Sequence, residues 1–370
     1  MSLAHSRLVI AGGTVIDPET RLEQHTNVLL EGGRIVGLAR EVPSDWDAAP
    51  EIDAAGAWVL PGLICLRTHV GEPGFEWRED VASASFAGAA GGFTTLCATP
   101  DTDPVNDVRA VTEQIMTRSA AALGARVVPV GAATKGLKGQ HLAEMGDLQD
   151  AGCVAVSTGE TSVVDGQLMR RILEYARSID TRVFSSPGEP SMTRGGLMNE
   201  GLMSLRLGLP GIPAESEAVS ILRDGLLAKL AGTPLHFQRV STAAGLRALE
   251  FVRGEGAQVT ADCTPHHLWF SEAAVTGFDT TTKVTPPLRS PADVEALRDG
   301  VRRGLITAIA TDHSPRSQLE KWVEYNEASA GTTGLESALA AILELVRQKA
   351  FPLMDALARL TVGPAAVLGD

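Results

Sequence analysis

The stretch VLPGLICL, residues 59–66, marks the point where the pattern of the chain changes. From here on, apolar strand-like segments alternate with segments of helical periodicity, such as Leu168–Arg177 and Glu217–Ala231. Eight strands that are apolar on both faces favour a closed (β/α)8 TIM-like barrel, an α/β fold, over an open doubly wound sheet. The seven strand-like segments after the first are FTTLCAT (93–99), RVVPVGA (126–132), CVAVS (153–157), RVFSS (182–186), PLHFQRV (234–240), AQVTADC (257–263) and ITAIAT (306–311).

A different pattern precedes the barrel. LVIAGGTV (8–15) and residues 27–30 and 34–38 form short strand-like segments, joined by glycine-rich turns such as EGGR (31–34). We therefore expect residues 1–58 to contribute the N-terminal part of a small, flanking, β-sandwich-like domain.

Composition and charge exclude several classes of protein. The 370 residues carry a net charge of −13 and no run of Lys and Arg interleaved with aromatic residues, which argues against a nucleic-acid partner. No apolar segment approaches the roughly 18 residues that cross a bilayer, and no signal peptide is evident, so we expect a cytoplasmic protein without a membrane partner. The cysteines form no CxxC pair, which predicts buried, reduced thiols at Cys65, Cys97, Cys153 and Cys263.

Chemistry in such a barrel is expected where the strands end, because that face carries the functional loops. The residues at the predicted strand ends are His69, Pro100 with Asp101, Thr158, Ser186, Arg239, the pair His266 and His267, and Asp312 with His313.

Seven blocks of the chain resemble, in order, those of the dihydroorotase family of the amidohydrolase superfamily. The resemblance implies a metal-hydrolase-like barrel over residues 59–360 and, in active members, a binuclear zinc site that hydrolyses or closes the ring of dihydroorotate in pyrimidine biosynthesis. The family continues beyond residues 361–370, so this segment is expected to be a truncated return to the small β domain or the end of an incomplete sequence. The blocks are PGLI (61–64), EPGFEWREDV (72–81), AAGGFTT (89–95), RLGLPGIPAESE (206–217), TPHHL (264–268), PPLR (286–289) and ATDHSP (310–315).

The resemblance also locates the former zinc ligands. The family's Asp-x-His-x-His is Cys65-Leu66-Arg67-Thr68-His69 here, and an arginine cannot coordinate zinc. A bridging carboxylate is lost at Thr158 unless Glu160 takes its place. We therefore expect no metal cofactor; if zinc is bound, His69, Asp312 and Cys65 are the candidate ligands. The six former metal-site positions are Arg67, His69, Thr158, Ser186, Arg239 and Asp312.

The substrate side departs from the family as well, so no substrate-binding residue is predicted. Gly71 stands at the family's carboxylate-binding arginine, and Asp101 and Thr285 stand at two family asparagines. Asp101 would repel a substrate carboxylate. Arg316 replaces a family histidine, and the pair at 266 and 267 is expected to be scaffold.

Asp312 is expected to be a vestigial catalytic residue. A buried carboxylate without zinc needs a counter-charge, and Arg67 and Arg239 are predicted to point into the same cavity. We therefore expect the two guanidinium groups to fill metal positions and to pair with Asp312.

The sequence is compatible with three functions. The first is a non-catalytic dihydroorotase homologue, a pseudoenzyme that acts as a structural or regulatory partner of aspartate transcarbamoylase within a homo-oligomer or hetero-oligomer. The second is an active amidohydrolase that opens dihydroorotate or another cyclic amide with a degenerate mononuclear metal site. The third is a sensor in which Arg67, Arg239 and Arg316 bind an anionic metabolite.

Overall fold

The computed structural model describes residues 7–369, and their contacts divide the chain into two units, one up to Gly62 and one from Leu63 onward. Residues 1–6 and Asp370, which belong to the predicted segments 1–58 and 361–370, lie outside the described residues.

The first unit is one five-stranded sheet in the order β3-β2-β1-β4, with β5 also paired to β1. The β1–β2 and β2–β3 pairs are antiparallel, while β4 and β5 run parallel to β1. Trp46, on the 3-10 helix η2 (Ser44–Trp46), packs against Val9 and Leu29 and gives the sheet its small core. The strands are β1 (Arg7–Asp17), β2 (Leu22–Glu31), β3 (Arg34–Ala39), β4 (Glu51–Asp53) and β5 (Trp58–Val59).

The second unit is a barrel of eight parallel strands, which confirms the predicted fold class. The ladder runs β15-β14-β13-β10-β9-β8-β7-β6, and a parallel bridge between Thr68 and His313 joins its two ends. The strands are β6 (Leu63–Thr68), β7 (Phe93–Ala98), β8 (Arg126–Ala132), β9 (Ala155–Ser157), β10 (Val183–Ser185), β13 (Leu235–Phe237), β14 (Val259–Cys263) and β15 (Ala308–Ile309).

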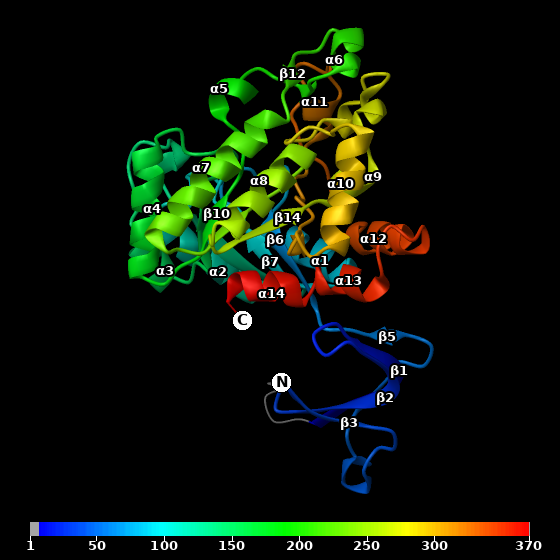
Figure 1. The fold of residues 1–370 in the computed structure, drawn as a ribbon. Helices are drawn as coiled ribbons and strands as arrows, with labels where there is room; N and C mark the ends of the chain where they lie inside the picture. The colour runs from blue at the N-terminus through cyan, green and yellow to red at the C-terminus, as the bar shows by residue number, and fades with distance from the viewer. Residues whose placement is uncertain (1–6, 370) are drawn as a thin grey trace. The chain divides into compact units, whose positions relative to one another are not determined.

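A helix follows every barrel strand before the next one begins, and Figure 1 shows these helices around the outside of the strands. The eight connecting helices, in chain order, are α1 (Val81–Ala90), α2 (Arg109–Ala121), α3 (Met145–Asp150), α4 (Gly166–Ser178), α7 (Glu215–Ala231), α8 (Ala243–Gly254), α10 (Pro291–Arg302) and α12 (Ala338–Arg347). Shorter elements in the loops and at the end are η3 (Lys135–Leu137), α5 (Pro190–Thr193), β11 (Met198–Asn199), α6 (Leu202–Leu207), β12 (Gly211–Ile212), α9 (Pro265–Trp269), η4 (Glu272–Val275), η5 (Thr280–Thr282), α11 (Gln318–Lys321), α13 (Leu353–Ala358) and α14 (Val362–Leu368).

Apolar side chains fill both sides of the barrel wall. Leu66, Val130 and Phe184 belong to a cluster of strand residues, and a larger cluster lies between strands and helices. The four cysteines are free and buried, as predicted, and burial raises the pKa of the Cys65 and Cys97 thiols. None of the helices in residues 7–369 is long and apolar enough to cross a membrane.

Two boundaries differ from those expected. Trp58 and Val59 pair with β1 of the small sheet, so the first barrel strand begins only at Leu63. Residues 362–368, expected to return to the small β domain, instead form α14, whose buried Val367 packs with the barrel cluster that includes Leu66. Burial of this apolar side chain against the barrel accounts for the difference.

Candidate active site

Three of the predicted strand-end residues, His69, Arg239 and Asp312, line one cavity of about 330 Å³. Arg239 and Asp312 help to line it, and both have left-handed backbone conformations, with φ of 59° and 49°. Such conformations are costly for residues other than glycine and concentrate at functional sites. The backbone N–H of Arg239 donates to Asp262 Oδ1 at 2.6 Å, which helps to hold this conformation.

Arg67, on β6, is the largest of the fully buried side chains and is 1% exposed. Its Nε donates to Asp312 Oδ1 at 2.8 Å, its Nη1 donates to Gln238 Oε1 at 3.0 Å, and its Nη2 bonds to Glu160 Oε1. Every nitrogen of the guanidinium therefore has an acceptor, and the two carboxylates supply the counter-charge that a buried cation requires.

Arg239 makes a second set of contacts from the other side of Glu160. Its Nη1 donates to Glu160 Oε2 at 2.9 Å and to the Thr285 carbonyl at 2.7 Å, and it lies 3.7 Å from Asp312 Oδ1. Its Nη2 donates to Ser186 Oγ at 3.0 Å. Arg67 and Arg239 thus both turn toward Asp312, as the sequence predicts.

These contacts set the charges of the cluster. The side chain of Glu160 is 41% exposed, and its partial desolvation would raise the pKa, but the charges of Arg239 and Arg67 lower the pKa to about 2. Burial would likewise raise the pKa of Asp101, and the neighbouring His69 and Arg67 instead hold it well below its usual range. Both acids are therefore carboxylates at neutral pH.

His69 lies between these carboxylates. Its Nδ1 is 2.7 Å from Asp101 Oδ2 and 3.2 Å from Thr99 Oγ1, and its Nε2 is 3.3 Å from Glu160 Oε1 and 4.0 Å from Asp312 Oδ1. Asp101 thereby fixes the orientation of the ring.

His69, Asp101 and Glu160 form a group that could hold a metal ion, because their ligand atoms all lie within 4.8 Å of one another. This group overturns the expectation that no metal cofactor is held. It also differs from the predicted set of His69, Asp312 and Cys65, since Cys65 Sγ is engaged by the Arg67 carbonyl and Thr311 Oγ1, each at 3.1 Å.

The donor set fits one cation rather than the binuclear pair that the resemblance implies. One imidazole and two carboxylates meet the three-ligand requirement of a catalytic metal. A second cation would need ligands at positions now held by Arg67, Thr158, Ser186 and Arg239, none of which supplies an imidazole or a carboxylate.

The remaining predicted positions have structural contacts. Ser186 Oγ donates to the Gly159 carbonyl at 2.6 Å, and the Ser186 N–H donates to Thr158 Oγ1 at 3.3 Å. His267 and His313 are hydrogen-bonded to Thr264 and Glu79 respectively. His266 packs on His267 with ring centroids 4.6 Å apart, and burial and the charge of Arg239 lower its pKa to about 3.

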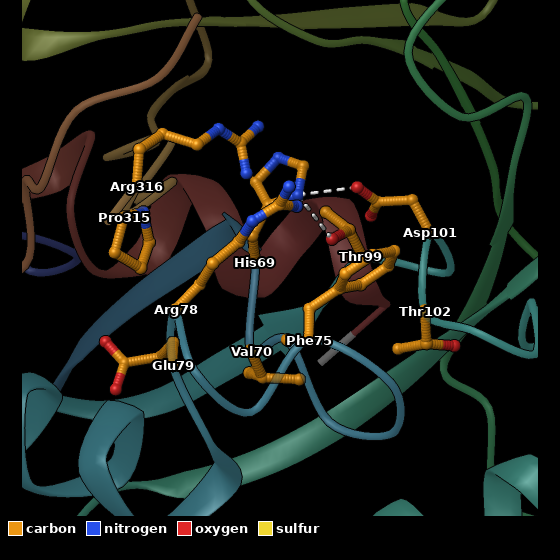
Figure 2. Close-up of a pocket in the computed structure, with 11 residues that line it drawn as sticks. His69, Val70, Phe75, Arg78, Glu79, Thr99, Asp101, Thr102, Pro315 and Arg316 are labelled. Atoms are coloured by element: carbon orange, nitrogen blue, oxygen red, sulfur yellow. Dashed lines mark hydrogen bonds and ion pairs between the residues drawn. The ribbon is translucent and has the colours of Figure 1, made fainter. Parts of the chain in front are cut away.

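The predicted site list omitted Asp101 and Glu160 as metal ligands. Each had a signal, because Asp101 and Glu160 each lie three residues after the end of a barrel strand, β7 and β9 respectively. Arg78 was also missed. It belongs to the loop after β6 and, with His69 and Asp101, lines the hollow shown in Figure 2.

Replacing Arg67 with Met should destabilise the protein by about 3–5 kcal/mol, because Asp312 and Glu160 would lose a buried counter-charge. The double variant Arg67→Met/Asp312→Asn should recover part of this loss. Arg347→Met, which breaks an exposed pair with Glu344, is the control and should cost about 0–1 kcal/mol. Urea unfolding followed by circular dichroism measures all three; equal stability of Arg67→Met and wild type would contradict the buried pair.

Zinc should bind metal-free protein at about one ion per chain, and Asp101→Asn or Glu160→Gln should weaken binding at least 10-fold by removing a ligand. Asp103→Asn, an exposed neighbour outside the group, should leave the affinity unchanged. Isothermal titration calorimetry gives both stoichiometry and affinity. Undiminished zinc binding in both ligand variants would contradict the site.

Comparison with known proteins identifies the family of the chain. A model of the family described as Dihydro-orotase-like matches residues 56–244. The dihydroorotase of Syntrophotalea carbinolica is 44% identical over 98% of this chain and 85% of its own length, and that of Syntrophus aciditrophicus is 43% identical with the same coverage.

The solved structure of L-hydantoinase (dihydropyrimidinase) from Arthrobacter aurescens superposes with a TM-score of 0.85 over 98% of this chain and 82% of its own. Its 20% identity is informative about the fold alone. The sequence identity to the dihydroorotases, over almost the whole chain, carries the assignment: the chain belongs to the dihydroorotase-like family.

Proposed function

We propose that this protein is a hydrolase of cyclic amides of the dihydroorotase type, which acts in pyrimidine biosynthesis, in the cytoplasm, with one divalent cation. The observation that carries the proposal is the group of His69, Asp101 and Glu160 beside Asp312 at the barrel mouth. The names and the 41–44% identity of the relatives support the same class of reaction.

The cavity suits a small ring. Its volume of about 330 Å³ lies at the lower end of the range for ligand sites, and its lining includes His69, Glu160 and Asp312. A cyclic amide seated there would have its reacting carbonyl near the candidate ligands. The buried arginines contribute by holding the carboxylates in fixed positions, which lowers the cost of reorganisation during reaction.

Asp312 is the residue best placed to move a proton. Its Oδ1 accepts from Arg67 Nε at 2.8 Å, while Oδ2 accepts no hydrogen bond from any residue in the range 7–369. We assign Oδ2 as the acceptor of the proton released when water attacks the amide carbonyl, and as its donor to the departing ring nitrogen. A divalent cation, when bound, would supply a Lewis acid that polarises the carbonyl and acidifies water.

Protein loaded with zinc should hydrolyse dihydroorotate, dihydrouracil or hydantoin, and Asp312→Asn should lower kcat by about 100-fold or more because the proton acceptor is lost. Asp103→Asn is the matched control and should keep wild-type activity. Ring opening is measured by the change in the ultraviolet absorbance of the ring amide. No turnover of any of these rings, with zinc bound at one ion per chain, would refute the hydrolase.

A second candidate is a non-catalytic partner of aspartate transcarbamoylase. The observation that favours it is that the guanidinium groups of Arg67 and Arg239 already neutralise Glu160, which reduces the attraction of this site for a cation. A guanidinium supplies charge but cannot act as a Lewis acid.

If the second candidate is correct, the purified chain and the transcarbamoylase of its source should co-elute at micromolar concentration and raise each other's Tm. Arg67→Met should leave the association intact if the interface lies away from the cavity. Separate elution of the two proteins at these concentrations would reject this role.

A further inference from the structure

The mouth of the cavity contains two arginines that the ion-pair cluster does not use. Arg78, in the loop after β6, and Arg316, in the loop after β15, both line the main cavity and the adjoining hollow around His69. Figure 2 shows both side chains extending toward the ring of His69, with Asp101 on the other side of the ring. Two guanidinium groups from opposite ends of the barrel sequence therefore meet beside the candidate metal group.

Their donors remain available to a ligand. Arg316 Nε donates to the Ala330 carbonyl at 2.7 Å, and its two terminal nitrogens have no acceptor within residues 7–369. Arg78 pairs with Glu320 through Nε and Nη2, and its Nη1 has no acceptor among the same residues. This differs from Arg67, whose three nitrogens are all engaged.

The electrostatics of the pair favour an anion. Burial lowers the pKa of Arg316 and the like charge of Arg78 lowers it further, whereas the carboxylates of Glu160, Glu320 and Asp101 raise it. The two cations therefore repel each other, and the carboxylates offset this repulsion only in part. An anion between them would relieve this repulsion and satisfy the free N–H groups, which form strong charge-assisted hydrogen bonds with carboxylates.

Both side chains are held in place before any ligand arrives. The Arg78 guanidinium stacks on Phe75 and Trp77, with its carbon 4.6 and 5.7 Å from the ring centroids, and Glu320 binds it from the loop that carries α11. Arg316 is fixed by its bond to Ala330. Little side-chain freedom would be lost on binding, which favours affinity.

Gly71, which lines the same hollow as Arg78 and Arg316, offers an anion no side chain at the family's usual arginine position. Its φ is +68°, and a Cβ at this residue would lie 2.3 Å from the Glu79 carbonyl oxygen and 2.8 Å from that of Phe75. The loop conformation thus excludes any side chain at position 71, and Asp101 adds a negative charge nearby. The positive charge available to a substrate comes instead from Arg78 and Arg316.

We propose that Arg78 and Arg316 form the anion subsite of this cavity, and that they bind a carboxylate attached to the cyclic amide ring. The choice of ligand rests on the proposed function, whereas the subsite itself can be tested by binding alone. Dihydroorotate and dihydrouracil are suitable probes, because they share a ring and differ in the carboxylate.

Wild-type protein should bind dihydroorotate at least 10-fold more tightly than dihydrouracil in calorimetric titrations. Arg316→Gln and Arg78→Gln should each weaken dihydroorotate binding by about 10- to 100-fold and leave dihydrouracil binding unchanged, because each removes a charged donor to the carboxylate alone. Arg206→Gln, at an exposed position on α6, is the control and should bind like wild type.

Arg78→Gln removes both the ion pair with Glu320 and the donor to the ligand. The variant Glu320→Gln removes the ion pair alone, keeps both arginines and should therefore keep the preference for the ring with a carboxylate. Binding of neither ring by wild type, equal binding of both, or an unchanged preference in the double variant Arg78→Gln/Arg316→Gln would overturn the subsite. The two proposals can fail separately. If the protein hydrolyses no ring but still prefers dihydroorotate, and this preference needs both arginines, the subsite is supported and the hydrolase is rejected.

Discussion

The buried ion pair between Arg67 and Asp312 is the constraint around which the rest of the site is arranged. It joins the first barrel strand to the residue that follows the last one, at the seam where the ladder closes through the bridge between Thr68 and His313. Both side chains are almost fully buried, so the pair must overcome a large desolvation cost through short contacts and additional acceptors such as Gln238. Its geometry then determines where Glu160 and Arg239 can lie.

The charges of the cluster do not cancel among the arginines and carboxylates alone. Asp101, Glu160 and Asp312 carry three negative charges, whereas Arg67 and Arg239 carry two positive ones. Within this cluster of five residues one negative charge therefore remains, and His69, Asp101 and Glu160 there form the group that could hold a cation. Arg78 and Arg316, outside the cluster, line the same cavity and add positive charge to its mouth.

This division of roles has a chemical consequence. A guanidinium can hold a carboxylate in place, but only a metal ion polarises a carbonyl as a Lewis acid. Arg78 and Arg316 differ from the buried arginines because they line the cavity and are not part of the ion-pair cluster. In the subsite proposed above, the buried cations organise the carboxylates and the cations at the mouth bind the anionic group of the ligand.

The sequence by itself determined the fold class and much of the site's location. Apolar strands alternating with helices are local patterns, so the barrel, the strand-end position of His69 and the pairing of Arg67 and Arg239 with Asp312 were all predictable. Only the tertiary structure brought Asp101 and Glu160 to His69, because these residues follow three different strands and meet only when the barrel closes. The left-handed loop at Gly71 and the packing of α14 were decided in the same way, by contacts between segments distant in the chain that no local pattern records.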